Sequence, residues 1–248
     1  MSSQSDIEWT EQTWNPITGC SKVSPGCKYC YAETLSKRLR AMGVRGYELG
    51  FNQVQTLPEK LHQPLQRKKH TVYFVNSMSD MFHESVPFSF IDKIFRTITQ
   101  AKQHTFQILT KRPQRMRKYF AIREVPDNAW LGVSVEDIKY GKPRIDVLRE
   151  IDAKTRFLSV EPLLEDLGTL DLDGIRWVIV GGESGPHARP MKKEWALNVR
   201  NQCVNQSVDF FFKQWGSWGH DGVKRNKKAN GRLLDGVIWD EIPIKQVI

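Results

Sequence analysis

The chain alternates between short runs of continuous apolar residues and longer stretches in which apolar residues recur every three or four positions. The runs are rich in β-branched and aromatic residues, and their starts lie roughly 20–35 residues apart, a spacing typical of βα units. Because they are apolar throughout rather than alternating, they indicate parallel strands that are buried on both faces of a sheet. We expect strands at 71–75, 105–109, 130–135, 156–160, 177–180 and 208–212.

The stretches between these runs predict helices. The clearest covers 87–101, where Ile91, Ile94, Phe95 and Ile98 follow a helical spacing. Further helices are expected at 32–42, 113–120, 143–151 and 192–204. This alternation predicts an α/β fold with a parallel sheet and helices outside it, either a complete or partial barrel or an open doubly wound sheet.

Polar residues and glycines follow each of the six predicted strands. In chain order they are Ser77, Ser79 and Asp80; Lys111 and Arg112; Ser134 and Glu136; Glu161; Gly181, Gly182 and Glu183; and Lys213 and Gln214. Any one group is explained by a turn or a helix cap. Parallel strands end at one edge of their sheet, where α/β proteins build their sites, so six such groups in succession predict a functional site there.

Charge and hydropathy narrow the function classes. The 248 residues carry a formal net charge of +9, which favours polyanionic partners such as nucleic acid. Three basic clusters are Arg67, Lys68 and Lys69; Lys111, Arg112, Arg115, Arg117 and Lys118; and Lys224, Arg225, Lys227, Lys228 and Arg232. Each cluster alone is typical of a solvated surface. No apolar stretch approaches the ~18 residues of a membrane span and the start is polar and acidic, so we expect a cytoplasmic protein without membrane contact.

Three of the four cysteines, Cys20, Cys27 and Cys30, form a C-x6-C-x2-C pattern. Clustered thiols in a chain without an export signal more often bind a metal than form disulfides. Three thiolates leave one coordination position open. A cubane iron–sulfur cluster would keep a free iron that can bind S-adenosylmethionine (SAM), whereas zinc would take water, Cys203 or a histidine as its fourth ligand. The spacing favours the cluster and leaves zinc as the alternative.

The cysteine motif lies among longer blocks that together resemble a known family. The blocks begin with IEWT and TWNPITGC in 7–20 and continue at 75–83, 109–113, 130–136, 159–163, 180–185 and 211–216. From about residue 7 to residue 218 the chain resembles a phage-associated, three-cysteine family of unknown function within the radical SAM superfamily. The first gap of six departs from the most familiar radical SAM spacing, C-x3-C-x2-C.

The resemblance implies a partial (β/α) barrel of about six parallel strands, with the cluster loop near the N-terminus. We expect this domain at 1–218, and a basic C-terminal extension, packed on the barrel or following it, at 219–248.

The resemblance also implies roles for the cysteines and the strand ends, although no catalytic residue is assigned. Cys20, Cys27 and Cys30 would ligate a 4Fe–4S cluster. SAM would contact Ser77, Ser79, Asp80, Ser134, Glu136, Gly181, Gly182 and Glu183. Substrate contacts would come from Lys111, Arg112, Glu161, Lys213 and Gln214.

The leading hypothesis is therefore a radical SAM enzyme that cleaves SAM reductively and abstracts hydrogen from an unidentified substrate, with nucleic acid the first class to test. It needs an external electron donor, and the resemblance adds a partner encoded nearby, of the three-cysteine-motif type. The alternative is a zinc-containing, non-catalytic nucleic-acid-binding protein, which would not explain the polar strand ends. Cys203 lies in a predicted helix beside Val199 and Val204, so we expect a buried core thiol rather than a hydrogen-atom donor.

Overall fold

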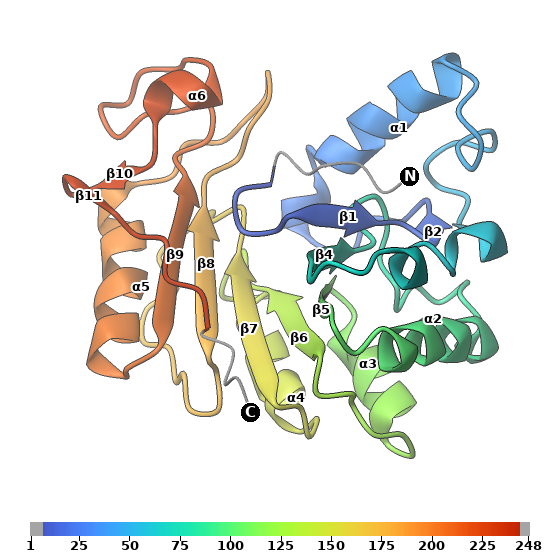
Figure 1. The fold of residues 1–248 in the computed structure, drawn as a ribbon. Coiled ribbons are helices and arrows are strands. Elements are labelled where there is room, and N and C mark those ends of the chain that lie inside the picture. Colours follow the sequence, from blue (N-terminus) through green and yellow to red (C-terminus); the bar gives the residue numbers. More distant parts are fainter. Residues whose placement is uncertain (1–6, 244–248) are drawn as a thin grey trace. The chain divides into compact units, whose positions relative to one another are not determined.

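The computed structural model describes residues 7–243 (Figure 1). In chain order the elements are β1 (Gln12–Trp14), β2 (Ile17–Thr18), α1 (Tyr31–Ala41), β3 (Gln55–Thr56), β4 (Val72–Val75), α2 (Phe88–Gln100), β5 (Thr105–Thr110), α3 (Pro113–Phe120), β6 (Ala129–Ser134), α4 (Pro143–Arg149), β7 (Thr155–Val160), β8 (Trp177–Gly181), α5 (Lys193–Asn205), β9 (Asp209–Gln214), α6 (Lys227–Asn230), β10 (Leu233–Leu234) and β11 (Val237–Ile238). Short 3-10 helices cover Pro25–Cys27, Pro58–Lys60 and Pro64–Gln66.

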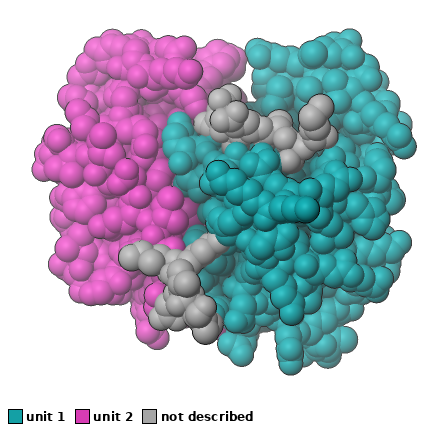
Figure 2. Space-filling view, viewed as in Figure 1, with its two compact units in different colours: residues 1–23, 30–132, 150–155 teal, residues 24–29, 133–149, 156–248 magenta. Residues whose placement is uncertain are grey.

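The chain divides into two compact units, which Figure 2 shows in different colours. The first comprises 1–23, 30–132 and 150–155, and the second comprises 24–29, 133–149 and 156–248. None of the helices within 7–243 has the length and apolar character that crossing a membrane requires.

Hydrogen bonds order seven of the strands as β1-β4-β5-β6-β7-β8-β9. In the first unit β4 pairs in parallel with both β1 and β5, and in the second unit β8 pairs in parallel with both β7 and β9. From β4 to β9 the order follows the chain without the reversal that defines a doubly wound sheet. The α/β fold with the strand order of a partial (β/α) barrel is thereby confirmed, with seven strands in place of about six.

All six predicted strands form, because each is a buried apolar run. β8 is the clearest case, with all five of its residues buried. The predicted helices also form, and α2 buries six residues at helical spacing, among them Ile91, Ile94 and Ile98. Within the seven-stranded sheet, the strand that the sequence did not predict is β1, which is three residues long and gives no pattern to detect. The two-residue strands β2, β3, β10 and β11 were not predicted either.

The C-terminal residues of the second unit pack on its strands. The indole Nε1 of Trp177, on β8, donates to the carbonyl oxygen of Glu241 at 2.8 Å, and that of Trp215 donates to Leu233 O at 2.9 Å. These contacts agree with an extension that packs on the strands, while the predicted boundary at residue 218 stays a prediction.

Helix α5 contacts β8 and β9 and carries Cys203 on its buried face. The side chain of Cys203 is fully buried, and burial raises the pKa of its thiol to about 12. The prediction of a core thiol at this position is confirmed.

The backbones that follow β8 and β9 approach each other so closely that glycine is required. A Cβ atom on Gly182 would overlap the carbonyl oxygen of Trp215, and one on Gly216, whose φ is +83°, would overlap that of Glu183. Gly182 N also donates to Gln214 O at 3.0 Å. Gly182, predicted as a cofactor contact, therefore has a packing role that accounts for the glycine without any ligand.

We expect Gly182→Ala to lower stability by about 3 kcal/mol, because the added methyl group meets backbone atoms that can move only by opening the β8–β9 connection. Gly168→Ala is the matched control. Gly168 has a φ of +61°, but a methyl group added there would meet no atom within 4 Å, so only its backbone conformation is penalised, by about 1 kcal/mol. Chemical denaturation followed by circular dichroism measures both. Equal losses in the two variants would contradict the close approach at Gly182.

Candidate functional site

The four cysteines are free thiols, and Cys20, Cys27 and Cys30 are partly exposed. Cys20 follows β2, and Cys30 is the N-cap residue of α1; both belong to the first unit. Cys27 belongs to the second unit, at the end of a 3-10 helix. Within residues 7–243, no three or more His, Cys, Asp or Glu side chains are already gathered to hold a metal ion. The donor chemistry still suits iron or zinc, since three partly exposed cysteines, none of them in a disulfide, carry the sulfur donors that both metals bind.

A glycine and its close neighbours fix the position of Cys20. Gly19 has a φ of +79°, and a Cβ there would overlap the carbonyl oxygen of Gln53. Cys20 N donates to Phe51 O at 2.7 Å. Cys20 and Cys30 also pack against an apolar group of which Phe51 and Met78 are members. The segment that follows β4 therefore lies against the part of the first unit that carries two of the cysteines.

Ser77 and Ser79 flank Met78 in that segment, and both are partly exposed. The Ser77 hydroxyl donates to Asn15 Oδ1 at 3.2 Å, and the Ser79 hydroxyl donates to Ile17 O at 2.9 Å. Because each hydroxyl proton is already used, the oxygen of each presents its lone pairs as acceptors. An acceptor of this kind suits an ammonium group such as that of SAM, the ligand predicted to contact both serines.

Asp80, predicted as a third SAM contact, uses both carboxylate oxygens within the protein. Its Oδ1 accepts from Phe82 N at 2.9 Å and from Thr110 Oγ1 at 2.7 Å. Its Oδ2 accepts from Lys111 N at 3.1 Å and from Arg112 Nη1 at 3.1 Å. The residue is buried, so its carboxylate joins the end of β4 to the end of β5 and is already well supplied with donors.

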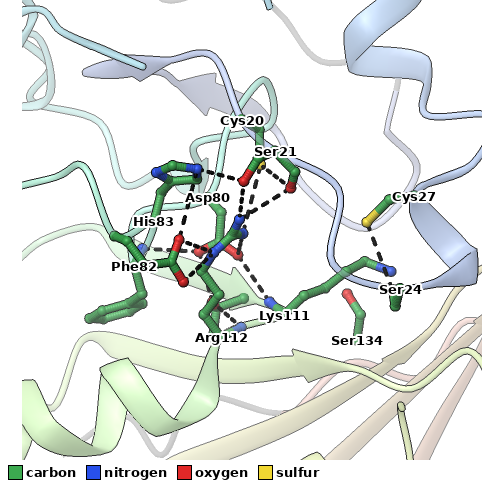
Figure 3. Close-up of polar contacts among 12 residues, drawn as sticks. Cys20, Ser21, Ser24, Cys27, Asp80, Phe82, His83, Lys111, Arg112 and Ser134 are labelled. Carbon is green, nitrogen blue, oxygen red and sulfur yellow. Dashed lines mark hydrogen bonds and ion pairs between the residues drawn. The ribbon is translucent and has the colours of Figure 1, made fainter. Parts of the chain in front are cut away.

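Arg112, predicted as a substrate contact, points toward Cys20 (Figure 3). Its Nη1 donates to the Sγ of Cys20 at 3.8 Å as well as to Asp80, and its Nη2 donates to Ser21 O at 3.1 Å and to Ser21 Oγ at 2.9 Å. Its Nε donates to Glu84 at 3.0 Å. Only 6% of the side chain is exposed. The structure thus brings Asp80 and Arg112 together at the first cysteine.

His83 completes this group, although no role was predicted for it from the sequence. The backbone N–H of Ser85 donates to its Nδ1 at 3.1 Å, and its Nε2 lies 2.8 Å from Ser21 Oγ. Burial and the nearby charge of Arg112 lower the pKa of His83. His83 is therefore a neutral imidazole whose Nε2–H donates to Ser21. The signal for it was its place at the end of the 75–83 block.

In the second unit, the predicted residue Glu136 supports the Cys27 loop, residues 24–29, and the predicted residue Ser134 bonds to the arginine that pairs with Glu136. The hydroxyl of Ser24 donates to Glu136 Oε1, and Cys27 N donates to Ser24 O at 2.9 Å. Arg144 Nη1 donates to Glu136 Oε2 at 2.7 Å and to Ser134 O at 2.6 Å. Glu136 is fully buried. Arg144 had no sequence signal beyond its position at the start of a predicted helix.

A second ion pair supports the same loop. Arg189 Nη2 donates to Glu183 Oε1 at 2.6 Å, and Arg189 Nε donates to Glu183 Oε2 at 2.8 Å. The same Nη2 donates to Pro25 O at 3.1 Å, and the guanidinium lies 5.4 Å from the centre of the Tyr29 ring. Glu183, predicted as a SAM contact, thus orients an arginine that holds the Cys27 loop.

Two predicted substrate contacts pair with each other. Lys213 Nζ lies 2.9 Å from Glu161 Oε1, and Ser159 Oγ donates to Glu161 Oε2 at 3.1 Å. A Cβ on Gly181 would lie 2.7 Å from Glu161 Oε1, so the glycine makes room for this carboxylate. Gln214 is buried, and its Nε2 donates to Ser184 Oγ at 2.9 Å. Of these, Glu161 and Lys213 keep enough exposure to meet a ligand.

The basic clusters differ in how much of their charge is free. Arg115 lies over the ring of Phe88, 4.5 Å from its centre, and Arg117 forms an ion pair with Glu150 at 2.7 Å. Lys227 and Lys228, on α6, form no salt bridge with any residue of 7–243. The cluster on α3 is therefore partly committed to packing and pairing. The C-terminal cluster is partly committed too, since Arg225 pairs with Asp221, but Lys227 and Lys228 keep their charges outside any ion pair with the described residues.

A sequence profile described as "Protein of unknown function (DUF5131)" matches residues 4–243. The chain belongs to this family. The predicted membership of a family of unknown function is thereby confirmed, while the phage association and the partner encoded nearby stay predictions. No curated protein matches the chain.

Several solved structures of spore photoproduct lyase are similar to this chain. A cysteine-to-serine mutant is 15% identical with a TM-score of 0.45, and the match covers 74% of this chain and 58% of that one. A complex with dinucleoside spore photoproduct is 14% identical with a TM-score of 0.44, covering 82% and 63%. A double mutant with bound AdoMet and dinucleoside spore photoproduct gives the same four values. The chain thus spans about three fifths of the length of these proteins.

We expect a thiol-alkylating reagent at pH 8 to modify Cys20, Cys27 and Cys30 in the folded, metal-free chain and to spare Cys203. A pKa raised to about 12 leaves Cys203 with roughly 10³-fold less thiolate than an ordinary cysteine, and its burial blocks access. Peptide mass spectrometry after timed alkylation measures the four rates. The denatured chain is the control, in which Cys203 reacts as well. Fast modification of Cys203 in the folded chain would contradict its burial.

Proposed function

We propose that the chain is a radical SAM enzyme in which Cys20, Cys27 and Cys30 ligate a 4Fe–4S cluster. The observation that carries the proposal is the set of three partly exposed cysteines, none of them in a disulfide, in a C-x6-C-x2-C motif, the first of which accepts a hydrogen bond from a buried arginine. When bound, the cluster would supply an open iron for SAM and the electron for its reductive cleavage. An external donor would provide that electron.

The residues of the chain would bind SAM and the substrate and would hold the Cys27 loop in position. Ser77 and Ser79 offer hydroxyl oxygens to the ammonium group of SAM. Glu136 and Glu183, together with their arginines, would hold the Cys27 loop in place. Glu161 and Lys213 remain as substrate contacts, since their ion pair is partly exposed.

Two candidate fourth ligands of the zinc alternative are already engaged elsewhere in the protein. A structural zinc site needs a fourth protein ligand. Cys203 is fully buried on α5, and its thiol is held neutral by a raised pKa. Among the histidines, His83 has one ring nitrogen accepting from Ser85 N and the other bonded to Ser21. Neither side chain is available to close a zinc site without breaking these arrangements, whereas the exposed His187, whose ring centre lies 5.6 Å from that of Tyr29, keeps the zinc alternative open for the test that follows.

Anaerobic reconstitution with iron and sulfide tests the metal. We expect wild-type protein and Cys203→Ala to gain the broad absorbance near ~400 nm of a thiolate-ligated cluster, and Cys27→Ala to lack it. After dithionite reduction with SAM, chromatography should detect 5′-deoxyadenosine only in the first two. A colourless wild-type protein that retains zinc would establish the alternative. Loss of the chromophore in Cys203→Ala would show that the cluster has a fourth protein ligand.

Nucleic acid is the substrate class that the charge favours, and we propose the unpaired lysines of α6 as contacts. The logarithm of affinity should fall linearly with that of salt concentration, with a slope that reports the number of phosphates neutralised. Replacing Lys227 and Lys228 together with alanine should flatten the slope by about 1.4 on single strands. Arg117→Ala is the control, because its charge is paired with Glu150. Fluorescence anisotropy with a labelled oligonucleotide measures the slopes, and binding that ignores salt would contradict the proposal.

A further inference from the structure

We propose that Arg112 is a positioning residue for the metal centre: its Nη1–H group donates to the sulfur of Cys20 and raises the reduction potential of the cluster ligated there. This inference rests on the proposed function, in which Cys20 is a cluster ligand. It replaces the role predicted for Arg112 from sequence, which was contact with the substrate.

The N–H groups of Arg112 are all used within the protein. A guanidinium carries five N–H groups and no acceptor. The five acceptors that Arg112 meets are a carboxylate of Glu84, Asp80 Oδ2, Cys20 Sγ, Ser21 O and Ser21 Oγ. Each N–H group therefore has a partner within the protein, and with only 6% of its side chain exposed, Arg112 has none left for a substrate.

The side chain of Arg112 is held in place beside Cys20. The backbone N–H of Arg112 donates to Thr110 Oγ1 at 2.9 Å, and Pro113 begins α3 directly after it. The buried carboxylate of Asp80 and the exposed carboxylate of Glu84 form ion pairs with different nitrogens of the guanidinium. The group cannot turn away from Cys20 without breaking several charge-assisted hydrogen bonds, which are stronger than hydrogen bonds between neutral groups.

The positive charge of Arg112 would favour the reduced state of a cluster bound at Cys20. Reduction adds negative charge to an iron–sulfur cluster, and hydrogen bonds to its sulfurs are among the features that set its potential. A donor that carries a positive charge in a poorly solvated site stabilises the reduced state more than the oxidised one. Asp80 offsets part of the charge of Arg112 at longer range, so the directed N–H group acts mainly on the sulfur that it contacts.

The midpoint potential of the reconstituted cluster, measured by a redox titration followed by electron paramagnetic resonance, tests the inference. In Arg112→Gln we expect the oxidised-to-reduced ratio at a fixed potential to rise about tenfold, a shift of about 59 mV toward negative values for a one-electron couple. Arg112→Lys keeps the charge and should recover part of the shift. Arg117→Gln, which removes the same charge from an exposed ion pair, should leave the potential unchanged.

A second variant, Glu84→Gln, should shift the midpoint potential in the opposite direction without disturbing the core. The Glu84 side chain is 67% exposed, and its removal frees Arg112 from a competing carboxylate. We expect a rise in potential, with the oxidised-to-reduced ratio falling about twofold. If Arg112→Gln does not fold, the potential of Glu84→Gln tests the inference instead. An unchanged potential in that variant overturns it.

Three results would separate the alternatives. An unchanged potential in Arg112→Gln overturns the inference. Lower iron content and a lower melting temperature, with an unchanged potential for the clusters that remain, assign Arg112 a structural role only and overturn it too. A wild-type chain that forms no iron–sulfur cluster contradicts the proposed function itself, and the inference with it.

Discussion

The buried ion pair between Asp80 and Arg112 is the interaction on which the site in the first unit depends. Asp80 joins the ends of β4 and β5 through Thr110 Oγ1 and Lys111 N, and Arg112 extends the connection to Cys20 and Ser21. Removing one partner of a buried pair leaves an uncompensated charge, at a cost of about 3–5 kcal/mol. The loops after the two strands and the cysteine-bearing segment are therefore constrained together.

In the second unit, carboxylate–arginine ion pairs support the Cys27 loop in a similar way. Glu136 is paired with Arg144, and Glu183 with Arg189; one pair bonds to Ser24 and the other to Pro25. In both units a carboxylate from a strand end thus reaches a cysteine-bearing segment through a hydrogen-bond partner. If Cys20 and Cys27 ligate the proposed metal centre, these carboxylates would act on the ligands through their hydrogen-bond partners and would help to orient them.

The sequence predicts which residues belong to this region better than it predicts what they contact. Buried apolar runs such as β8 determine the strands, and the strand order then brings their carboxyl ends to one edge of each unit's sheet. Periodicity carries no information about pairing, however. Asp80 and Arg112 are 32 positions apart, and Arg117 and Glu150 are 33 apart, so neither partnership could be read from local pattern. Charged residues expected to meet ligands or phosphates are therefore found bonded to the protein itself.

This pairing also bears on which ligand the site can accept. SAM carries a net positive charge, since its sulfonium adds to an amino acid whose ammonium and carboxylate cancel. Unpaired arginines beside the cysteines would repel it, even though they would favour thiolates. Arg112, Arg144 and Arg189 are instead each matched by a buried carboxylate. Arg112 and Arg189 each direct an N–H group at a cysteine-bearing segment, and Arg144 supports one through Glu136, while each contributes little net charge beyond its partner. Lys227 and Lys228, which form no ion pair with the described residues, lie on α6, where their charge is available to a polyanion.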